Sequence, residues 1–160
     1  MHSQDWRVQG KMELAVKVKM LKDGAILPRY ATSGSAGVDL HACLDTSEEV
    51  ILQPGEVAKI PTGLALELPS SEVVALVMAR SGLAAKHGLD LANGVGVIDS
   101  DYRGELQVLV RNLGKSPFSI RHGDRIAQML FMPVVQVRLQ ISGELAETER
   151  GSGGFGSTGI

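Results

Sequence analysis

Residues 64–78 read LALELPSSEVVALVM, and this stretch contains both kinds of strand pattern that recur along the chain. In its first part, leucines alternate with Ala65 and Glu67, which is the period of a strand with one buried face. Pro69 marks a break, and residues 73–78 are then apolar throughout, as expected for a strand covered on both faces. The stretch therefore predicts two successive β-strands.

The same two-residue period extends to segments on either side, at residues 14–20, 106–111 and 135–141. The six prolines lie between such runs or at their ends, where a sheet loses no ladder hydrogen bond. Of the remaining sequence, only residues 81–87 favour a short helix. The 19 glycines and the 4% of aromatic residues suit tight turns around an aliphatic core. We expect an all-β protein with one short helix.

The length of 160 residues favours one domain. We expect residues 13–149 to form this β domain and residues 150–160 to form a flexible, glycine-rich C-terminal arm. Residues 1–12 show no periodicity, so they are expected to form a disordered extension or to lie upstream of a true start at Met12.

Charge and hydrophobicity exclude several classes of partner. The net charge is −2 and no basic stripe is visible, so we expect no binding to nucleic acid. The longest apolar run, residues 73–79, is far shorter than the roughly 20 residues of a membrane helix, so we expect no membrane partner. No signal peptide is visible, and Cys43 is a single cysteine without an internal disulfide partner. These features favour a cytoplasmic location.

The C-terminal segment 150–160 reads RGSGGFGSTGI. Its composition alone predicts a disordered end. However, glycine-rich backbone can wrap phosphate oxygens with N–H groups, and Arg150 adds a planar cationic donor. Phe155 can stack on a base, and Ser157 and Thr158 supply hydroxyl groups. The segment has no lysine and no following helix, so it is not a Walker A loop, and it indicates a nucleotide lid.

A second segment, ARSGLA at residues 79–84, follows the apolar strand directly. If Arg80, Ser81 and Gly82 precede a helix, their N–H groups and the serine hydroxyl form an anion site at its N-terminus. The same residues are equally consistent with an N-cap serine beside a surface arginine.

Three more segments contain polar side chains at turns: AGVDL at residues 36–40, NGVGVIDSDYRG at residues 93–104 and GDRIAQ at residues 123–128. Asp99 and Asp101 either form an Asx-rich hairpin turn or supply a general base or an indirect metal ligand. The four histidines have no metal-ligand spacing, so we expect no zinc site.

In this order, the five segments resemble the five motifs of the homotrimeric dUTP pyrophosphatases (dUTPases), and the resemblance covers about residues 13–160. The family fold is a distorted jelly roll, which agrees with the strand pattern. The resemblance implies hydrolysis of dUTP to dUMP and pyrophosphate with Mg²⁺. It also implies a homotrimer with shared active sites, in which the arm of one chain crosses to a neighbour. Such an enzyme limits uracil incorporation into DNA and supplies dUMP for thymidylate synthesis.

The resemblance also assigns roles to individual residues. It implies that Asp99 activates the water that attacks the α-phosphorus, and that Arg150 closes on the γ-phosphate. Asp39 is expected to act on the magnesium through water. Tyr102 is expected to pack beneath the deoxyribose, where a ribose 2′-hydroxyl would clash.

The resemblance implies three further groups of substrate-binding residues and one substrate-contacting residue on a strand. They are the phosphate binders Arg80, Ser81, Gly82 and Gln128, the uracil hairpin Asn93, Gly96, Val97 and Ile98, the arm residues Phe155, Gly156, Ser157 and Thr158, and the strand residue Gln107. Two positions depart from the family pattern: Ala79 replaces a proline, and Gly94 stands where a larger apolar residue is common.

Two alternatives are a dCTP deaminase-like enzyme and a non-catalytic nucleotide-binding protein of the same fold. Residues 98–102 and the complete arm favour dUTP hydrolysis over deamination. Asp99 and Arg150 argue against a pure binder, which needs neither.

Overall fold

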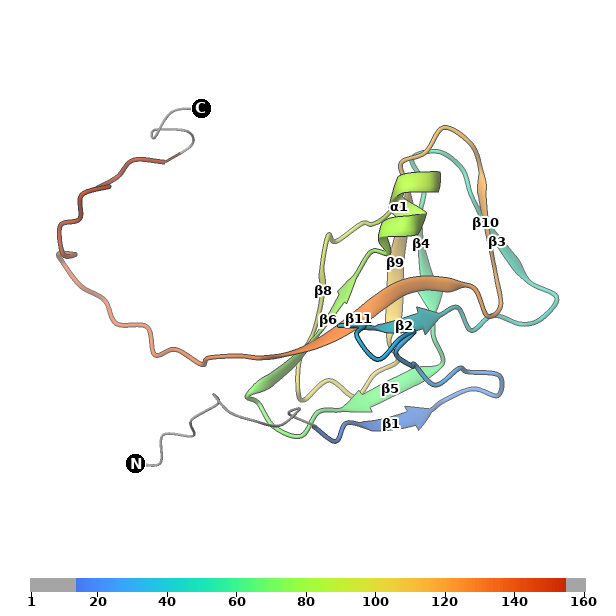
Figure 1. Cartoon of the computed structure of the whole chain (residues 1–160), viewed down its shortest axis with the longest axis horizontal. Helices are drawn as coiled ribbons and strands as arrows, with labels where there is room; N and C mark the ends of the chain where they lie inside the picture. Colours follow the sequence, from blue (N-terminus) through green and yellow to red (C-terminus); the bar gives the residue numbers. More distant parts are fainter. Residues whose placement is uncertain (1–13, 155–160) are drawn as a thin grey trace.

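The computed structural model describes residues 14–154 and confirms an all-β architecture with one short helix (Figure 1). In chain order, the elements are β1 (Lys17–Met20), β2 (Val38–His41), β3 (Glu49–Leu52), β4 (Val57–Pro61), β5 (Leu64–Glu67), β6 (Val73–Met78), α1 (Ser81–His87), β7 (Leu89–Leu91), β8 (Gly96–Ile98), β9 (Gln107–Asn112), β10 (Phe118–Arg121) and β11 (Arg125–Pro133).

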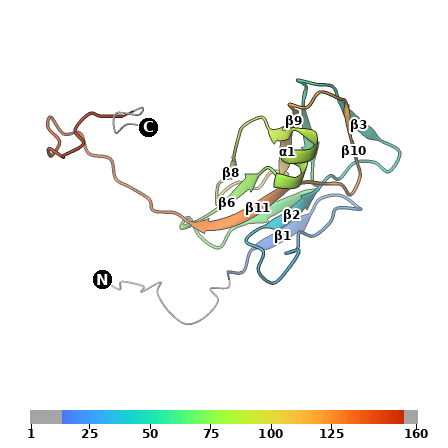
Figure 2. The ribbon, with the colours of Figure 1, turned by 45° about the horizontal axis from the view of Figure 1, so that its top comes forward.

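The strands form four antiparallel sheets within this part of the chain. One sheet has four strands in the order β2-β11-β6-β8, and another has three in the order β4-β9-β7. The pairs β1-β5 and β3-β10 complete the body, and Figure 2 shows α1 above the four-stranded sheet. The side chains enclosed by these sheets are mostly aliphatic, with Thr62 and Asn112 as buried polar residues; the largest apolar ones include Leu40, Leu52, Ile60, Leu64, Leu91, Leu106, Ile120 and Met129.

The strand predictions for residues 64–68, 73–78 and 106–111 are confirmed by β5, β6 and β9. The run 73–78 pairs on both edges, with β11 and β8. Its side chains are buried or half-buried on both faces, with Val73, Val74, Ala75 and Val77 buried, which explains why the run lacks polar residues. Only the second half of the segment 14–20 is a strand.

The prediction of a strand at residues 135–141 is wrong for this chain. After β11 the backbone leaves the sheet, and the last backbone hydrogen bond that the described segment makes to the body runs from Val134 N–H to the carbonyl of Glu72 at 2.8 Å. Val135 is 88% exposed and Leu139 is 90% exposed, and both views show the segment leading away from the body (Figures 1 and 2). A strand needs a partner for its ladder, and the described part of the chain offers none here.

No helix in the described residues is long and apolar enough to cross a membrane.

Candidate functional site

The four-stranded sheet brings together four of the five segments singled out in the sequence. Asp39 on β2 lies opposite Gln128 on β11, and Gln128 lies opposite Met78 on β6, two residues before Arg80. On the other edge of β6, Val77 lies opposite Gly96 of β8. The strand order β2-β11-β6-β8 therefore places residues distant in sequence side by side (Figure 1).

Arg80 is held at this sheet by an ion pair with Asp39. Its Nε donates a hydrogen bond to Asp39 Oδ1 at 2.9 Å, and the two side chains are only 23% and 17% exposed. Gln128 supports the same loop, because its Nε2 donates to the carbonyl of Ala79 at 2.9 Å. The predicted phosphate binders Arg80 and Gln128 thus belong to one assembly. Gln128 fixes the backbone from which the Arg80 side chain extends.

The helix α1 begins directly after Arg80, which is its N-cap residue with φ −88° and ψ 125°. The Arg80 carbonyl accepts hydrogen bonds from the N–H groups of Leu83 and Ala84. Ser81 is therefore not the N-cap but the first helical residue, and both it and Gly82 are exposed. The N–H groups of Leu83 and Ala84 are thus used within the helix, whereas those of Ser81 and Gly82 have no acceptor inside it and remain available to an anion.

A second arginine joins this assembly from the start of β11. Arg125 Nη1 donates a hydrogen bond to Asp39 Oδ2 at 3.1 Å, so one carboxylate bridges two guanidinium groups. His41, opposite Arg125 in the β2–β11 register, is the nearby titratable group. Burial lowers the pKa of His41; Asp39 acts in the opposite direction, while Arg125 and Arg80 lower it further. With His41 neutral at pH 7, the face carries two cations and one carboxylate, a charge balance suited to phosphate.

The hairpin that contains β8 presents the predicted base-binding residues. Asn93, Val97 and Asp99 are exposed, whereas Gly96 is buried. A Cβ atom at Gly96 would lie 3.2 Å from the Cβ of Val77, so the hairpin backbone packs closely on β6. Gly94 has φ +69°, a left-handed conformation that favours glycine at this position.

Beyond β8, the chain turns at Asp99, whose carbonyl accepts a hydrogen bond from Tyr102 N–H at 3.2 Å. The Tyr102 hydroxyl donates to the carbonyl of Glu105 at 3.0 Å. The Glu105 carboxylate accepts from Gly63 N–H at 2.9 Å and from Gln107 Nε2 at 3.3 Å. The hydrogen bond to Glu105 therefore fixes the position of the Gln107 side chain.

Sequence reasoning assigned no role to Glu105 or Arg125. Both lie inside or directly after quoted segments, but their partners, Gly63 and Asp39, are 42 and 86 residues away in the sequence. No local signal could have identified these contacts.

Arg150, the one predicted site residue of the arm that the structure describes, is not part of this assembly in the single chain. Arg150 is exposed, and its Nε donates to the carbonyl of Gly153 at 3.0 Å. Phe155, Gly156, Ser157 and Thr158 lie outside the described residues. The carboxylates and histidines of residues 14–154 form no cluster of three or more that could hold a metal ion.

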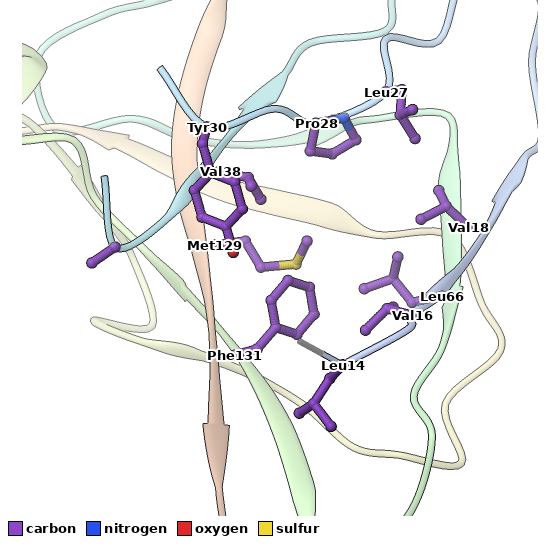
Figure 3. Close-up of a pocket in the computed structure, with 11 residues that line it drawn as sticks. Leu14, Val16, Val18, Leu27, Pro28, Tyr30, Val38, Leu66, Met129 and Phe131 are labelled. Carbon is purple, nitrogen blue, oxygen red and sulfur yellow. The ribbon is translucent and has the colours of Figure 1, made fainter. Parts of the chain in front are cut away.

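A hollow of about 320 Å³ lies elsewhere on the body (Figure 3). Apart from Tyr30, the residues that line it have apolar side chains: Leu14, Val16, Val18, Leu27, Pro28, Tyr30, Ala36, Val38, Leu66, Met129 and Phe131. Figure 3 shows Phe131 and Met129 from β11 directed into it, facing Leu14 and Val16. Such a surface has no cation for a triphosphate and is suited to apolar side chains.

A family model described as dUTPase matches residues 23–159 of the chain. A deoxyuridine 5'-triphosphate nucleotidohydrolase of Desulfitobacterium hafniense is 59% identical over 150 residues, which cover 91% of this chain and 98% of that protein. One from Neisseria meningitidis serogroup A is 50% identical, with 93% of this chain and 99% of that protein covered.

Solved structures that resemble this chain are also dUTPases. The dUTPase of Staphylococcus bacteriophage 80alpha, solved with dUpNHpp, superposes with a TM-score of 0.81 at 28% identity, covering 91% of this chain and 99% of that one. A mutant dUTPase from phage phi11 of S. aureus, in which a structural Mg(II) ion is coordinated, has a TM-score of 0.73 at 25% identity, with 83% and 99% covered. The distorted jelly roll expected from the sequence is the fold of these proteins.

Proposed function

The chain belongs to the dUTPase family and is a dUTP-hydrolysing enzyme; we propose that it forms dUMP and pyrophosphate by directing a water molecule at the α-phosphorus. The observation that carries this proposal is the four-stranded sheet, which gathers Asp39, Gln128, the Arg80 loop and the β8 hairpin at one place.

The phosphates of dUTP bind to the Arg80 loop. The Arg80 guanidinium is fixed through its Nε by Asp39. A planar cation held in this way can donate further hydrogen bonds to phosphate oxygens without first losing side-chain freedom. Ser81 and Gly82 add the N–H groups of the first helical turn, and Gln128 keeps the loop in place.

The hairpin from Asn93 to Ile98 selects the base. Uracil and cytosine present opposite hydrogen-bonding groups, so the wrong base leaves polar groups unpaired, which discriminates strongly. Tyr102, folded back by its bond to the Glu105 carbonyl, supports the deoxyribose and excludes a 2′-hydroxyl. Gln107 contacts the substrate from β9.

Asp99 serves as the general base. It is exposed at the end of β8, directly after the base-binding hairpin. A carboxylate there can accept a proton from a water molecule aligned with the α-phosphorus. Pyrophosphate then leaves, and the dUMP formed retains the deoxyribose and base contacts.

The residues of the site fit Mg²⁺ that is held by substrate oxygens and water. Each Asp39 oxygen accepts one hydrogen bond from an arginine and keeps a further lone pair for a water molecule in the ion's hydration shell. When bound, the ion neutralises triphosphate charge and polarises phosphoryl oxygens. Because Mg²⁺ commonly binds through phosphates and few protein groups, the lack of a carboxylate cluster in residues 14–154 is compatible with this role.

The active assembly is a homotrimer in which the segment 135–141 of one chain docks on another. Four of its side chains, Val135, Val137, Leu139 and Ile141, alternate and are between 72% and 107% exposed. A chain rarely leaves such a regular apolar face in water, so a second copy is the expected cover.

A surface that could receive this segment exists on the body. Within residues 14–154, β1 pairs with β5 on one edge only, and the apolar hollow of Figure 3 lies beside β1. Docking there would carry Arg150 and residues 155–158 away from their own body to a neighbouring site. Light scattering tests this proposal: a monomer with full activity would contradict it.

The reaction would limit uracil incorporation into DNA and supply dUMP for thymidylate synthesis. These roles belong to the cytoplasm, which we propose as the location of the protein.

The test of the proposed function is pyrophosphate release with Mg²⁺ from dUTP, dCTP, dTTP and UTP, measured in parallel. We expect release from dUTP alone. Ammonia from dCTP without pyrophosphate would instead indicate a deaminase, and no reaction with any of the four would indicate a binding protein.

A further inference from the structure

A bulge at the start of β11 determines where Arg125 points. In the β2–β11 register, Gln128 lies opposite Asp39, Ala127 opposite Leu40 and Arg125 opposite His41, so Ile126 is an extra residue. Ile126 and Ala127 are both buried, although neighbouring residues of a regular strand face opposite sides. The extra residue therefore turns Arg125 to the face that carries Asp39 and Gln128. Bulges are frequent beside active sites, where they redirect a side chain.

Arg125 completes a bridge that ends at Arg80. Asp39 Oδ2 accepts from Arg125 Nη1 at 3.1 Å, and Asp39 Oδ1 accepts from Arg80 Nε at 2.9 Å. The backbone carbonyl of Arg125 also lies 3.5 Å from Arg80 Nη1. Arg125 thus approaches Arg80 through both its side chain and its backbone.

The two ends of this bridge differ in exposure. The Arg80 side chain is 23% exposed and that of Asp39 is 17% exposed, whereas that of Arg125 is 52% exposed. A carboxylate held by only one arginine can rotate about its last side-chain bond. A second guanidinium on the other oxygen fixes its plane, and with it the plane of Arg80.

We propose that Arg125 is a positioning residue for triphosphate binding, acting through Asp39 to fix the orientation of the Arg80 guanidinium. This inference rests on the proposed function, because it assumes that Arg80 binds the phosphates of dUTP. It assigns Arg125 no contact with the substrate.

The chain offers a matched control for an arginine–carboxylate pair. Arg121, the last residue of β10, pairs with Glu49 at 2.9 Å, and its side chain is 72% exposed. This pair joins β10 to β3, which within residues 14–154 form a sheet separate from the four-stranded sheet that carries the Arg80 loop.

The experiment combines Arg125→Met, Arg125→Lys and the control Arg121→Met with a double-mutant cycle that includes Arg80→Met. For each variant, kcat and KM for dUTP, the melting temperature, and the affinities for a non-hydrolysable imido analogue of dUTP and for deoxyuridine are measured. We expect Arg125→Met to lower kcat/KM and analogue affinity at least about 10-fold, the scale of a misplaced binding group. Deoxyuridine, which has no phosphate, should bind as in the wild type, and Arg125→Lys should recover part of the loss by keeping the charge.

In the Arg80→Met background, removal of Arg125 should change analogue affinity by less than about 3-fold, because no guanidinium remains to be placed. If removal of Arg125 lowers analogue affinity as much in the Arg80→Met background as in the wild type, the proposal is overturned, since Arg125 would then act on the phosphates directly. Equal losses for the analogue and deoxyuridine with a lower melting temperature would reduce Arg125 to a purely structural role. Wild-type behaviour of Arg125→Met would also overturn it.

Failure of the proposed role of Arg125 can be distinguished from failure of the proposed dUTP hydrolysis. If the wild type binds the analogue without releasing pyrophosphate, the proposed reaction fails, yet the binding cycle still measures the coupling of Arg125 to Arg80. If the wild type binds no analogue, both proposals fail.

Discussion

The hydroxyl of Tyr102 donates a hydrogen bond to the carbonyl oxygen of Glu105, 3.0 Å away, and this bond holds the phenol ring across Gly104. A Cβ atom at position 104 would lie 2.6 Å from Cζ and 2.9 Å from Cε2 of the ring. The glycine is thus required by the aromatic ring above it, since the Tyr102 side chain occupies the space of any Cβ. The position of the ring and the identity of residue 104 are coupled.

Gly104→Ala should therefore displace Tyr102 from the place proposed for the deoxyribose. We expect kcat/KM for dUTP to fall about 10-fold and the preference for dUTP over UTP to decrease, because the ring no longer excludes the 2′-hydroxyl. Parallel kinetics with both nucleotides measure this. Gly34→Ala is the matched control, because a Cβ atom there would meet nothing within 4 Å. An unchanged dUTP/UTP ratio in Gly104→Ala would remove Tyr102 from sugar discrimination.

Asp99→Asn tests the proposed general base. The amide keeps the size of the side chain but accepts no proton, so we expect kcat to fall at least about 100-fold while binding of a non-hydrolysable analogue stays near wild type. Single-turnover kinetics and isothermal titration separate the two effects. Asp101→Asn, which changes an exposed carboxylate two residues away, should retain turnover. Wild-type kcat in Asp99→Asn would refute the assignment.

The strands that the sequence predicted well are those whose partners lie in the same chain. The run 73–78 is covered on both faces, and the leucines that alternate at 64–68 are all buried, so local pattern and tertiary contacts agree. The alternation at 135–141 is equally regular, yet these residues form no strand. A two-residue period indicates that one face of a segment is apolar, but it does not identify the surface that covers this face.

The candidate site was predictable only in part, for a related reason. The Arg80 loop and Gln128 were recognised as motifs, and the sheet brings them together. The bridge from Arg80 through Asp39 to Arg125 was not, because it depends on a bulge in β11 that becomes visible only when the strands are paired. Side-chain direction at a bulge is set by long-range register and not by local sequence.

Cys43 provides a test of the core that is independent of catalysis. The side chain is 4% exposed, and burial raises the pKa of its thiol above the ordinary value of 9.0, with Lys22 acting in the opposite direction and Glu105 and Asp45 raising it further. Because the thiolate is the reactive form, a disulfide reagent should modify the native protein at least about 100-fold more slowly than the unfolded protein. Rapid modification of the native protein would contradict a closed core at this position.

The same burial predicts a dependence of stability on pH. As the pH rises through 9.0, the unfolded thiol loses its proton while the folded thiol keeps it. The unfolded state then binds fewer protons, so the free energy of unfolding falls with increasing pH. Urea titrations between neutral pH and pH 10 should show this decline, and Cys43→Ala should reduce it.

A chain that ends at Glu149 tests the arm. Arg150 is exposed and its Nε donates to Gly153, within the arm itself. Removal of residues 150–160 should therefore leave the melting temperature within about 2 °C of wild type. Turnover of dUTP should fall on the order of 1,000-fold, the scale for loss of an arginine that stabilises a phosphoryl-transfer transition state. A chain that ends at Gly154 keeps Arg150 but lacks Phe155 and the hydroxyl residues, so its activity separates the guanidinium from the rest of the arm. Full turnover of the chain that ends at Glu149 would exclude the arm from the site, and a large loss of stability would show that it belongs to the folded body.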